Sequence, residues 1–355
     1  MPKKILLVSF CVACAVLAAT LAIVFILSSR ESGKIAEREY PLTENSPSAA
    51  SATENEPVPT ASSTVAPSEN TEINILFAGD LMLDRGVEYY VNKLAAGDFK
   101  FPFEKAAEYL NSFDAVITNL EGPVSDKGVL SGSIYSFRMS PSVLAVFPYA
   151  NIKAVNVANN HAWDYGRDAF EDTLARLKEN NIGYFGGGKS ENEAYSPYIF
   201  EKNGIKIAIL GFTEFLESVR ANGNEAGIAF SSPEKMEAAI KAAKQKTNIV
   251  IAQFHFGEEY RETPVERQVN IARAAIDAGA DIVIGHHPHV VETSEEYKGK
   301  MIFYSLGNFV FDQGFSKETM SPGLLEVGIT ANGIEKAVLR QTSLTKYFEL
   351  LPPEK

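Results

Sequence analysis

Histidine is scarce in this chain and unevenly placed. All five histidines lie between residues 161 and 289, and three of them fall within four consecutive positions. They belong to a set of clusters that each follow a short apolar run, and these clusters begin at Asp80, Asn119, Asn159, His255, Gly285 and Gly307. Ligands of open α/β sheets bind at the carboxyl ends of the strands. If the apolar runs are strands, one sheet edge therefore receives Asp, Glu, Asn and His side chains together.

The residue types in these clusters are metal ligands. Carboxylates, amide oxygens and imidazoles without any thiolate suit borderline to hard divalent ions such as Mn, Fe or Zn. One tetrahedral ion needs about four ligands. The clusters offer more, which favours two ions about 3.5–4 Å apart that share a bridging carboxylate. Such a pair can generate hydroxide at neutral pH and hold both oxygens of a phosphoryl displacement.

Each cluster taken alone has an ordinary explanation. An Asp after a strand commonly caps a turn or a helix, His255 could be a core histidine, and residues 286–289 could bind metal adventitiously. None of these explanations accounts for every histidine lying at a strand end. Cysteine chemistry is excluded for the rest of the chain, because Cys11 and Cys14 both lie in the first apolar stretch.

His161 is the candidate general acid of the site. It directly follows Asn160, and adjacent residues rarely reach the same ion, so a coordinating Asn160 would place His161 over a leaving group. An imidazole, with an unperturbed pKa of about 6.5, can donate a proton at neutral pH. Asp164 is close in sequence and could orient the ring. The alternative is a structural histidine that hydrogen-bonds the loop before the next helix.

Alternating apolar runs and amphipathic stretches must position these residues. The apolar runs predict buried strands at 73–78, 115–118, 152–158, 206–210, 249–254, 281–284 and 301–304. The amphipathic stretches predict helices at 103–110, 169–179, 233–244 and 264–278. Asn203-Gly204 and Asn332-Gly333 predict hairpin turns, and antiparallel strands are expected at 324–329 and 337–339. We therefore expect an α/β body with a mixed sheet over residues 72–345, followed by a tail over 346–355.

The N-terminal residues predict an anchor and a tether. Residues 5–29 carry no charge, and 25 such residues can cross a hydrocarbon core of about 30 Å as a helix. We interpret residues 1–34 as a signal anchor; the alternatives are a cleaved signal peptide or a lipoprotein modified at Cys14. Lys3 and Lys4 favour a cytoplasmic N-terminus, which gives a single-pass protein of the cell membrane with an extracytoplasmic body. Residues 35–71 predict a disordered linker rich in Ser, Thr, Pro, Ala and Glu.

The charge balance bears on the partners. The chain has 33 basic and 45 acidic residues, a formal net charge of -12. It lacks the basic footprint of a nucleic-acid reader, so no nucleic-acid partner is expected. An anionic polymer would also be repelled, unless bound cations or a local arginine cluster, such as Arg138, Arg261 and Arg267, offset the acidic charge.

As a set, the motifs resemble those of the CapA family, the capsule synthesis proteins of bacterial poly-γ-glutamate production. The segments that carry the resemblance, in family order, are GDLML (79–83), NLEG (119–122), NNHAWDYG (159–166), HFG (255–257), GHHPHV (285–290) and GNFVFDQ (307–313). The N-terminal anchor and polar spacer are similar to that family as well. The family in turn resembles calcineurin-like metallophosphoesterases. That resemblance implies a mixed-sheet sandwich flanked by helices and a two-metal site.

The resemblance also assigns residues. It implies metal ligands at Asp80, Glu121, Asn160, His255, His287 and His289, with His161 beside the substrate. Within the same motifs, substrate binding is assigned to Asn119, His286, Asn308 and Asp312. The sequence departs from the phosphoesterase pattern at two places. Met82 stands where the usual Asp-x-His motif has its histidine, and Asn-Leu-Glu-Gly replaces the usual Gly-Asp motif.

The expected function is a role in poly-γ-glutamate capsule synthesis or export, with a divalent-metal hydrolase or transferase site outside the cytoplasm. The expected partners are the anionic polymer, membrane-embedded subunits of a polymer synthase and, through the N-terminal helix, the membrane. Two alternatives stay open. One is a cell-surface metallophosphoesterase that acts on an unrelated substrate. The other is a non-catalytic scaffold of a polymer synthase whose metal site only binds the chain.

Overall fold

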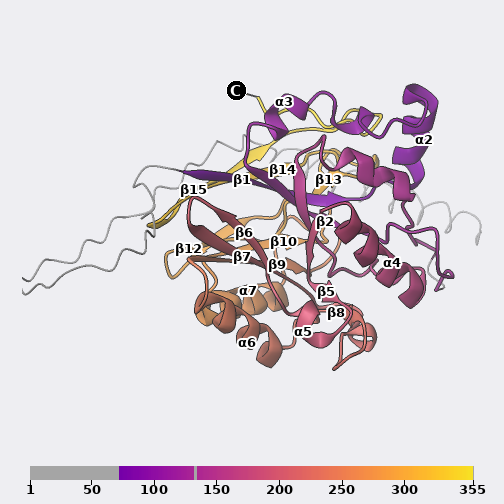
Figure 1. Ribbon diagram of the computed structural model, residues 1–355. Helices are drawn as coiled ribbons and strands as arrows, with labels where there is room; N and C mark the ends of the chain where they lie inside the picture. Colours follow the sequence, from indigo (N-terminus) through magenta and orange to yellow (C-terminus); the bar gives the residue numbers. More distant parts are fainter. Residues whose placement is uncertain (1–71, 132–133, 355) are drawn as a thin grey trace, which may run out of the picture. The chain divides into compact units, whose positions relative to one another are not determined.

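The computed structural model describes residues 72–131 and 134–354, so the predicted anchor (1–34) and linker (35–71) lie outside the described residues. Two mixed sheets form the centre of the described body (Figure 1). In the first sheet the strand order is β15-β14-β1-β2-β3-β4, with β13 also paired to β1. In the second the order is β11-β12-β10-β9-β7-β6. A further two-stranded sheet pairs β5 with β8.

The strands of the first sheet are β1 Ile73–Leu81, β2 Ala115–Leu120, β3 Ile152–Asn156, β4 Gly183–Phe185, β13 Asn308–Val310, β14 Gly323–Thr330 and β15 Gly333–Gln341. Those of the second are β6 Tyr198–Lys202, β7 Ile205–Thr213, β9 Ile249–His255, β10 Ile282–His286, β11 Ser294–Tyr297 and β12 Lys300–Phe303. The short pair is β5 Gly187–Gly188 with β8 Gly227–Ile228. The α-helices are α2 Arg85–Ala95, α3 Ala107–Leu110, α4 Gly166–Glu179, α5 Glu191–Ala194, α6 Pro233–Lys244 and α7 Glu266–Ala278.

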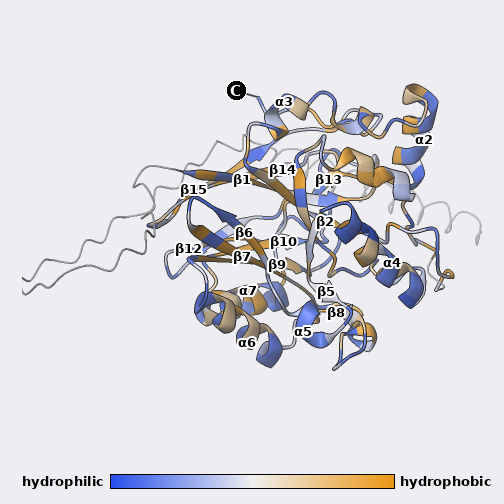
Figure 2. Ribbon diagram, viewed as in Figure 1, coloured by the Kyte–Doolittle hydropathy of each residue, from blue (hydrophilic) through white to orange (hydrophobic). Residues whose placement is uncertain are grey.

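The burial pattern shows why these strands stack into layers. On β1, Ile73, Ile75 and Phe77 pack into a core shared by both sheets, whereas Leu76 and Ala78 face a second core. That second core contains residues of α2, α3 and α4, and a third core lies between the second sheet, α6 and α7. Figure 2 shows apolar strands between helices of mixed hydropathy. Successive side chains point to opposite faces of a strand, so strands buried on both faces need helices outside and a sheet inside.

Most of the predicted elements are confirmed. All seven predicted apolar runs fall on strands, helices form around 169–179 and 264–278, and the helix 233–244 has its predicted bounds. Both expected hairpins form, since Lys202 pairs with Ile205 and Thr330 pairs with Gly333. The expected α/β body with mixed sheets flanked by helices is therefore confirmed. None of the helices in the described part is long and apolar enough to span a membrane.

The predicted helix 103–110 is wrong over its first half. Only a 3-10 turn, Phe101–Phe103, and the short helix α3 form there. A continuous helix would need the Pro102 carbonyl to accept the amide of Ala106. The Leu350 amide donates to that carbonyl at 2.8 Å instead, and Ala106 turns to the Phe103 carbonyl. Leu350 and Phe348, both in the segment predicted as a tail, are buried in the first core.

The sheet registers bring the predicted strand ends together. In the first sheet Asp80 pairs with Asn119 on β2 and with Asn308 on β13, through parallel ladders. In the second sheet His255 and His286 are paired neighbours on parallel strands. The carboxyl ends of the central parallel strands thus meet at one edge of the two-sheet body, as the sequence predicts.

Gly79 permits the closest of these approaches. A β-carbon at this position would lie 1.8 Å from the Gly307 carbonyl oxygen. The same carbonyl accepts the Asp80 amide at 2.9 Å, so the contact that excludes a side chain at residue 79 also fixes the backbone of Asp80.

We expect Gly79→Ala to lower the free energy of unfolding by about 3 kcal/mol or more. The added carbon would clash with the carbonyl oxygen and carbon of Gly307, which are backbone atoms and cannot rotate away. Urea denaturation measures it. The control is Gly299→Ala, where nothing lies within 4 Å of the added carbon but φ is +72°. That variant carries only the left-handed backbone cost of about 1–2 kcal/mol. An equal loss in both variants would contradict the close-approach explanation.

Candidate metal centre

Asp80 lies at the middle of the site. It is fully buried at the end of β1. Its Oδ1 accepts a hydrogen bond from Asn119 Nδ2 at 2.8 Å, and its Oδ2 accepts the His287 amide at 3.2 Å. Ring nitrogens surround the same carboxylate: His286 Nδ1 lies 3.5 Å from Oδ1 and His289 Nδ1 lies 3.5 Å from Oδ2. Asp80 therefore joins the ends of both sheets through one side chain.

Glu121 provides a second buried carboxylate. Its Oε1 lies 3.7 Å from His289 Nε2 and 3.8 Å from His161 Nε2. Within the described residues this buried oxygen has no hydrogen-bond partner. Asp80, Glu121 and His289 each offer a ligand atom, and the three atoms lie within 4.8 Å of one another. A buried acceptor without a donor is costly, and a cation at this position would satisfy it.

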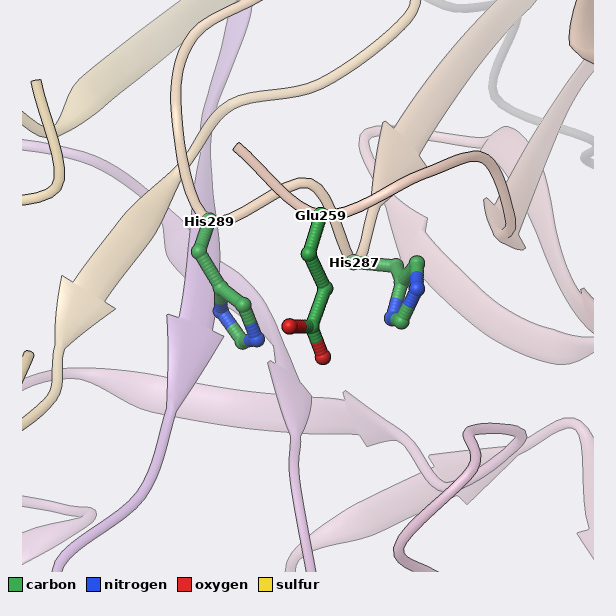
Figure 3. A group of neighbouring side chains, drawn as sticks. All are labelled: Glu259, His287 and His289. Atoms are coloured by element: carbon green, nitrogen blue, oxygen red, sulfur yellow. The ribbon is translucent and has the colours of Figure 1, made fainter. Parts of the chain in front are cut away.

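A second triad consists of Glu259, His287 and His289, whose ligand atoms also lie within 4.8 Å of one another. Figure 3 shows the Glu259 carboxylate between the two imidazoles. Both histidines have left-handed backbones, with φ of 100° at His287 and 59° at His289. His287 Nδ1 is buried and has no partner within the described residues. The two triads share His289, and together they offer ligand atoms for more than one ion.

Glu259 was not among the ligands predicted from the sequence. It follows His255 by four residues and lies in the loop after β9. Backbone hydrogen bonds on both sides of Glu259 hold that loop at the site: the Phe256 amide donates to the His286 carbonyl at 3.1 Å, and the Tyr260 amide donates to the Pro288 carbonyl at 2.8 Å. The only available sequence signal was its place in a strand-end cluster, since the path of a loop does not follow from periodicity.

The other predicted ligands adjoin the same cluster. His255 Nε2 lies 2.7 Å from Asn160 Oδ1, and His255 Nδ1 lies 3.3 Å from Asn119 Nδ2. The His255 and His287 rings are 4.9 Å apart. The structure thus brings all six predicted ligands into one continuous group, although their coordination of a metal stays a prediction.

Burial sets the charge of this group. It raises the pKa of Asp80 to about 7, against the hydrogen bonds from Asn119 and the His287 amide. Burial, followed by the charges of Asp80 and Glu259, raises the pKa of Glu121 well above its usual range. Burial also lowers the pKa of His287 and His289 to about 3. The imidazoles are therefore neutral at pH 7 and supply no charge to the carboxylates, which is the state that metal ligation requires.

His161 and Asp164 form the pair that the sequence suggested. His161 Nδ1 lies 2.8 Å from Asp164 Oδ2, and the same oxygen accepts the Phe137 amide at 2.7 Å. The His161 backbone is fixed as well, since its amide donates to Asn159 Oδ1 at 3.1 Å. With Nδ1 facing Asp164, the opposite nitrogen faces Glu121. The catalytic role of the pair stays a prediction.

The four residues assigned to substrate binding contact other residues of the chain. Asn119 bonds Asp80, His286 Nε2 lies 3.2 Å from Gln253, and Asn308 Oδ1 lies 2.9 Å from His289 Nδ1. Asp312 forms an ion pair with Arg85. The first three are fully or almost fully buried, a geometry that suits positioning of the ligands. Direct contact with a substrate stays a prediction.

The three arginines considered for charge compensation each have a local partner. Arg138 stacks on Tyr165 at 4.1 Å, Arg261 bonds Glu258 at 2.8 Å, and Arg267 bonds Glu214 Oε1 at 2.8 Å. Arg267 still adds to the lowering of the pKa of His287, which burial dominates. Arg85 of α2, which sequence reasoning did not single out, acts on Glu121 and His289.

These elements define an α/β protein of two packed mixed sheets with a buried carboxylate and imidazole centre at their common edge. The chain belongs to the family of bacterial capsule synthesis proteins described as PGA_cap, whose model matches residues 74–313. The matched segment contains all the residues of the centre described above.

Two curated relatives are similar over most of the body. The PGA biosynthesis protein CapA of Bacillus subtilis is 37% identical over 261 residues, which cover 72% of this chain and 68% of the relative. The capsule biosynthesis protein CapA of Bacillus anthracis is 34% identical over 274 residues, 75% of this chain and 66% of the relative. The match spans about two thirds of the length of each relative.

Among solved structures, a novel phosphatase from Mycoplasma pneumoniae is similar with a TM-score of 0.49 and 15% identity, over 77% of this chain and 94% of that chain. A putative 5'-nucleotidase from Staphylococcus aureus has a TM-score of 0.45 and 17% identity, over 80% of this chain and 55% of that chain. Likeness at this level does not assign an activity.

If Glu259 is a ligand, Glu259→Gln should weaken the binding of one divalent ion by at least about tenfold, because it removes a charged oxygen ligand while keeping the side-chain shape. Titration calorimetry with Mn²⁺, with metal analysis after dialysis, measures it. Glu258→Gln is the matched control, since Glu258 is the adjacent exposed carboxylate and pairs with Arg261. Unchanged affinity in Glu259→Gln, or an equal loss in both variants, would remove Glu259 from the centre.

Proposed function

We propose that this protein is a membrane-anchored, extracytoplasmic member of its family that acts in poly-γ-glutamate capsule synthesis or export and uses the buried centre for metal-dependent hydrolysis or transfer. The observation that carries the catalytic part is the His161–Asp164 pair beside a carboxylate that has an unpartnered buried oxygen. A centre that only held the fold together would not need an oriented imidazole at its edge.

The residues present fit divalent metal. Two buried carboxylates, an amide oxygen, neutral imidazoles and the orphaned Glu121 Oε1 form a donor set without thiolate. The residues that would hold the ions are Asp80, Glu121, Asn160, His255, Glu259, His287 and His289. Two ions held there would act as Lewis acids on a phosphoryl or acyl oxygen and would lower the pKa of water.

The role of His161 follows from its two contacts. Asp164 Oδ2 accepts from Nδ1 and also accepts the Phe137 amide, so the carboxylate that orients the ring is itself held in place. A carboxylate at Nδ1 stabilises the imidazolium. The proton available for transfer is then on Nε2, the nitrogen that faces Glu121. From that position His161 would donate a proton to the departing oxygen of the substrate.

The names of the two relatives support the proposed substrate and process. Both are described as biosynthesis proteins, one of PGA and one of capsule. We extend this to the present chain as a proposal: the polymer or a fragment of it is the substrate, and membrane-embedded subunits of a polymer synthase are the partners. The uncharged residues 5–29 support the membrane anchor, and extracytoplasmic placement of the body follows from that proposed anchor.

Turnover by a metal-restored protein tests the proposal. The assays are bis-p-nitrophenyl phosphate and γ-linked glutamate oligomers, each with metal-depleted and metal-restored full-length chain. We expect His161→Gln to keep its metal and its melting temperature and to lose about 10²- to 10⁴-fold in turnover. Asp168→Asn, an exposed change on the first turn of α4, is the control and should keep turnover.

Two results would contradict this assignment. Loss of metal in His161→Gln would make His161 a ligand, and full turnover in that variant would make it structural. Metal binding by the wild type without turnover of either substrate would favour the non-catalytic scaffold.

A further inference from the structure

Arg85 lies shortly after the end of β1 and has an unusual backbone conformation. It is the first residue of α2 and has φ of 52°, a left-handed conformation that costs a residue with a β-carbon about 1–2 kcal/mol. Asp84 stabilises it, since its Oδ1 accepts the Arg85 amide at 2.7 Å, and its Oδ2 accepts the Arg138 amide at 2.8 Å. Strain of this kind at a non-glycine residue persists where the surrounding structure imposes it.

Within the described residues, hydrogen bonds hold the Arg85 guanidinium along one edge. Arg85 Nε donates to Asp312 Oδ2 at 3.0 Å, and Nη2 pairs with Asp312 Oδ1. Asp312 is itself fixed, because its Oδ2 also accepts the Gly86 amide at 2.9 Å. No hydrogen-bond partner of Nη1 is found within residues 72–131 and 134–354. The side chain is 36% exposed. The edge of the guanidinium that carries Nη1 is therefore available to a ligand.

Arg85 is also next to the centre. Its guanidinium lies 4.7 Å from the centroid of the Phe137 ring, and the same ring lies 4.1 Å from the ring of His161. Arg85 and the proposed general acid therefore contact the same aromatic ring.

We propose that Arg85 binds an oxyanion of the substrate, a phosphoryl group or a carboxylate, at the edge of the metal centre. A guanidinium presents five donors in a planar fork. Asp312 occupies the Nε and Nη2 edge, which leaves Nη1 and the second Nη2 hydrogen for the two oxygens of an incoming group. The role of Asp312 is then to position Arg85. This inference rests on the proposed function and names the chemistry by which that site holds its substrate.

The proposed anion site would also allow the acidic body to bind an anionic substrate. A chain with a net charge of -12 repels anions at long range. Local recognition of an anion therefore needs a cation whose orientation is fixed in advance. Arg85 has this property, because its ion pair, its ring contact and its backbone conformation together restrict the side chain before a ligand arrives.

The first test is calorimetry of anion binding to metal-loaded protein. Inorganic phosphate and a γ-linked glutamate oligomer are titrated separately into wild type, Arg85→Gln and Arg273→Gln. Arg273 is the matched control, since it makes a comparable ion pair with Glu295 through Nε and Nη2. We expect Arg85→Gln to keep its bound metal and to weaken the anion by about 10- to 100-fold, the range for a hydrogen bond to a charged group. Arg273→Gln should bind like the wild type.

The second test uses the wild type alone, so it does not depend on the folding of a variant. Phenylglyoxal labels accessible guanidinium groups, and mass spectrometry reports the label on each arginine. Saturating phosphate or oligomer should protect Arg85 and leave the labelling of Arg273 unchanged. The anion that protects Arg85 from labelling shows whether the site binds a phosphoryl group or a carboxylate.

The outcomes separate this inference from the proposed function. Anion affinity within twofold of wild type in Arg85→Gln, unchanged labelling of Arg85, or failure of both anions to bind the metal-loaded wild type would overturn the Arg85 site while leaving the metal centre standing. Failure of the wild type to take up metal would overturn the proposed function itself. Protection of Arg85 without bound metal would support the anion site alone.

Discussion

Two carboxyl groups, Asp80 and Glu121, lie fully buried among neutral imidazoles, and much of the structure follows from that constraint. Removing charge from water is costly: a buried carboxyl group stays ionised only beside a paired or coordinated charge, and without one its pKa rises, as it does at Asp80 and Glu121. The histidines cannot supply the pairing because burial lowers their own pKa values to about 3 or below the usual range. Two arginines act on the group electrostatically, Arg85 on Glu121 and His289 and Arg267 on His287. The divalent cation proposed above would supply the missing positive charge.

The backbone serves the same constraint. His287 and His289 both have left-handed backbones; the His289 ring lies beside Asp80 and Glu121, and the His287 ring lies beside Glu259. The close approach of Gly79 to Gly307 fixes the amide of Asp80. Around the ligands, Asn119 and Asn308 hold Asp80 and His289 through their amides. Such neighbouring hydrogen bonds set ring orientation and ligand basicity in metal sites. Part of the cost of strain and burial therefore falls where the proposed chemistry occurs.

Much of this could be predicted from the sequence because strand periodicity and strand-end polarity are local signals. The runs from Ile73 and Ile249 read as strands buried on both faces, and polar residues directly after them mark the edge where parallel strands end. Three features could not be read in this way. The helix expected at 103–110 is interrupted by a hydrogen bond from Leu350, almost 250 residues away. Glu259 reaches the centre through a loop path, and Arg85 through a left-handed turn and a distant Asp312.

The measurement that tests the central claim most directly is anomalous X-ray diffraction from crystals of the protein grown with excess Mn²⁺. The account predicts anomalous density between Asp80, Glu121 and His289, with a second peak beside Glu259 and His287, and loss of the peak next to Asp80 in crystals of Asp80→Asn. Absence of anomalous density at these side chains in the wild type would contradict the account, because the buried carboxylates would then be sustained without a cation.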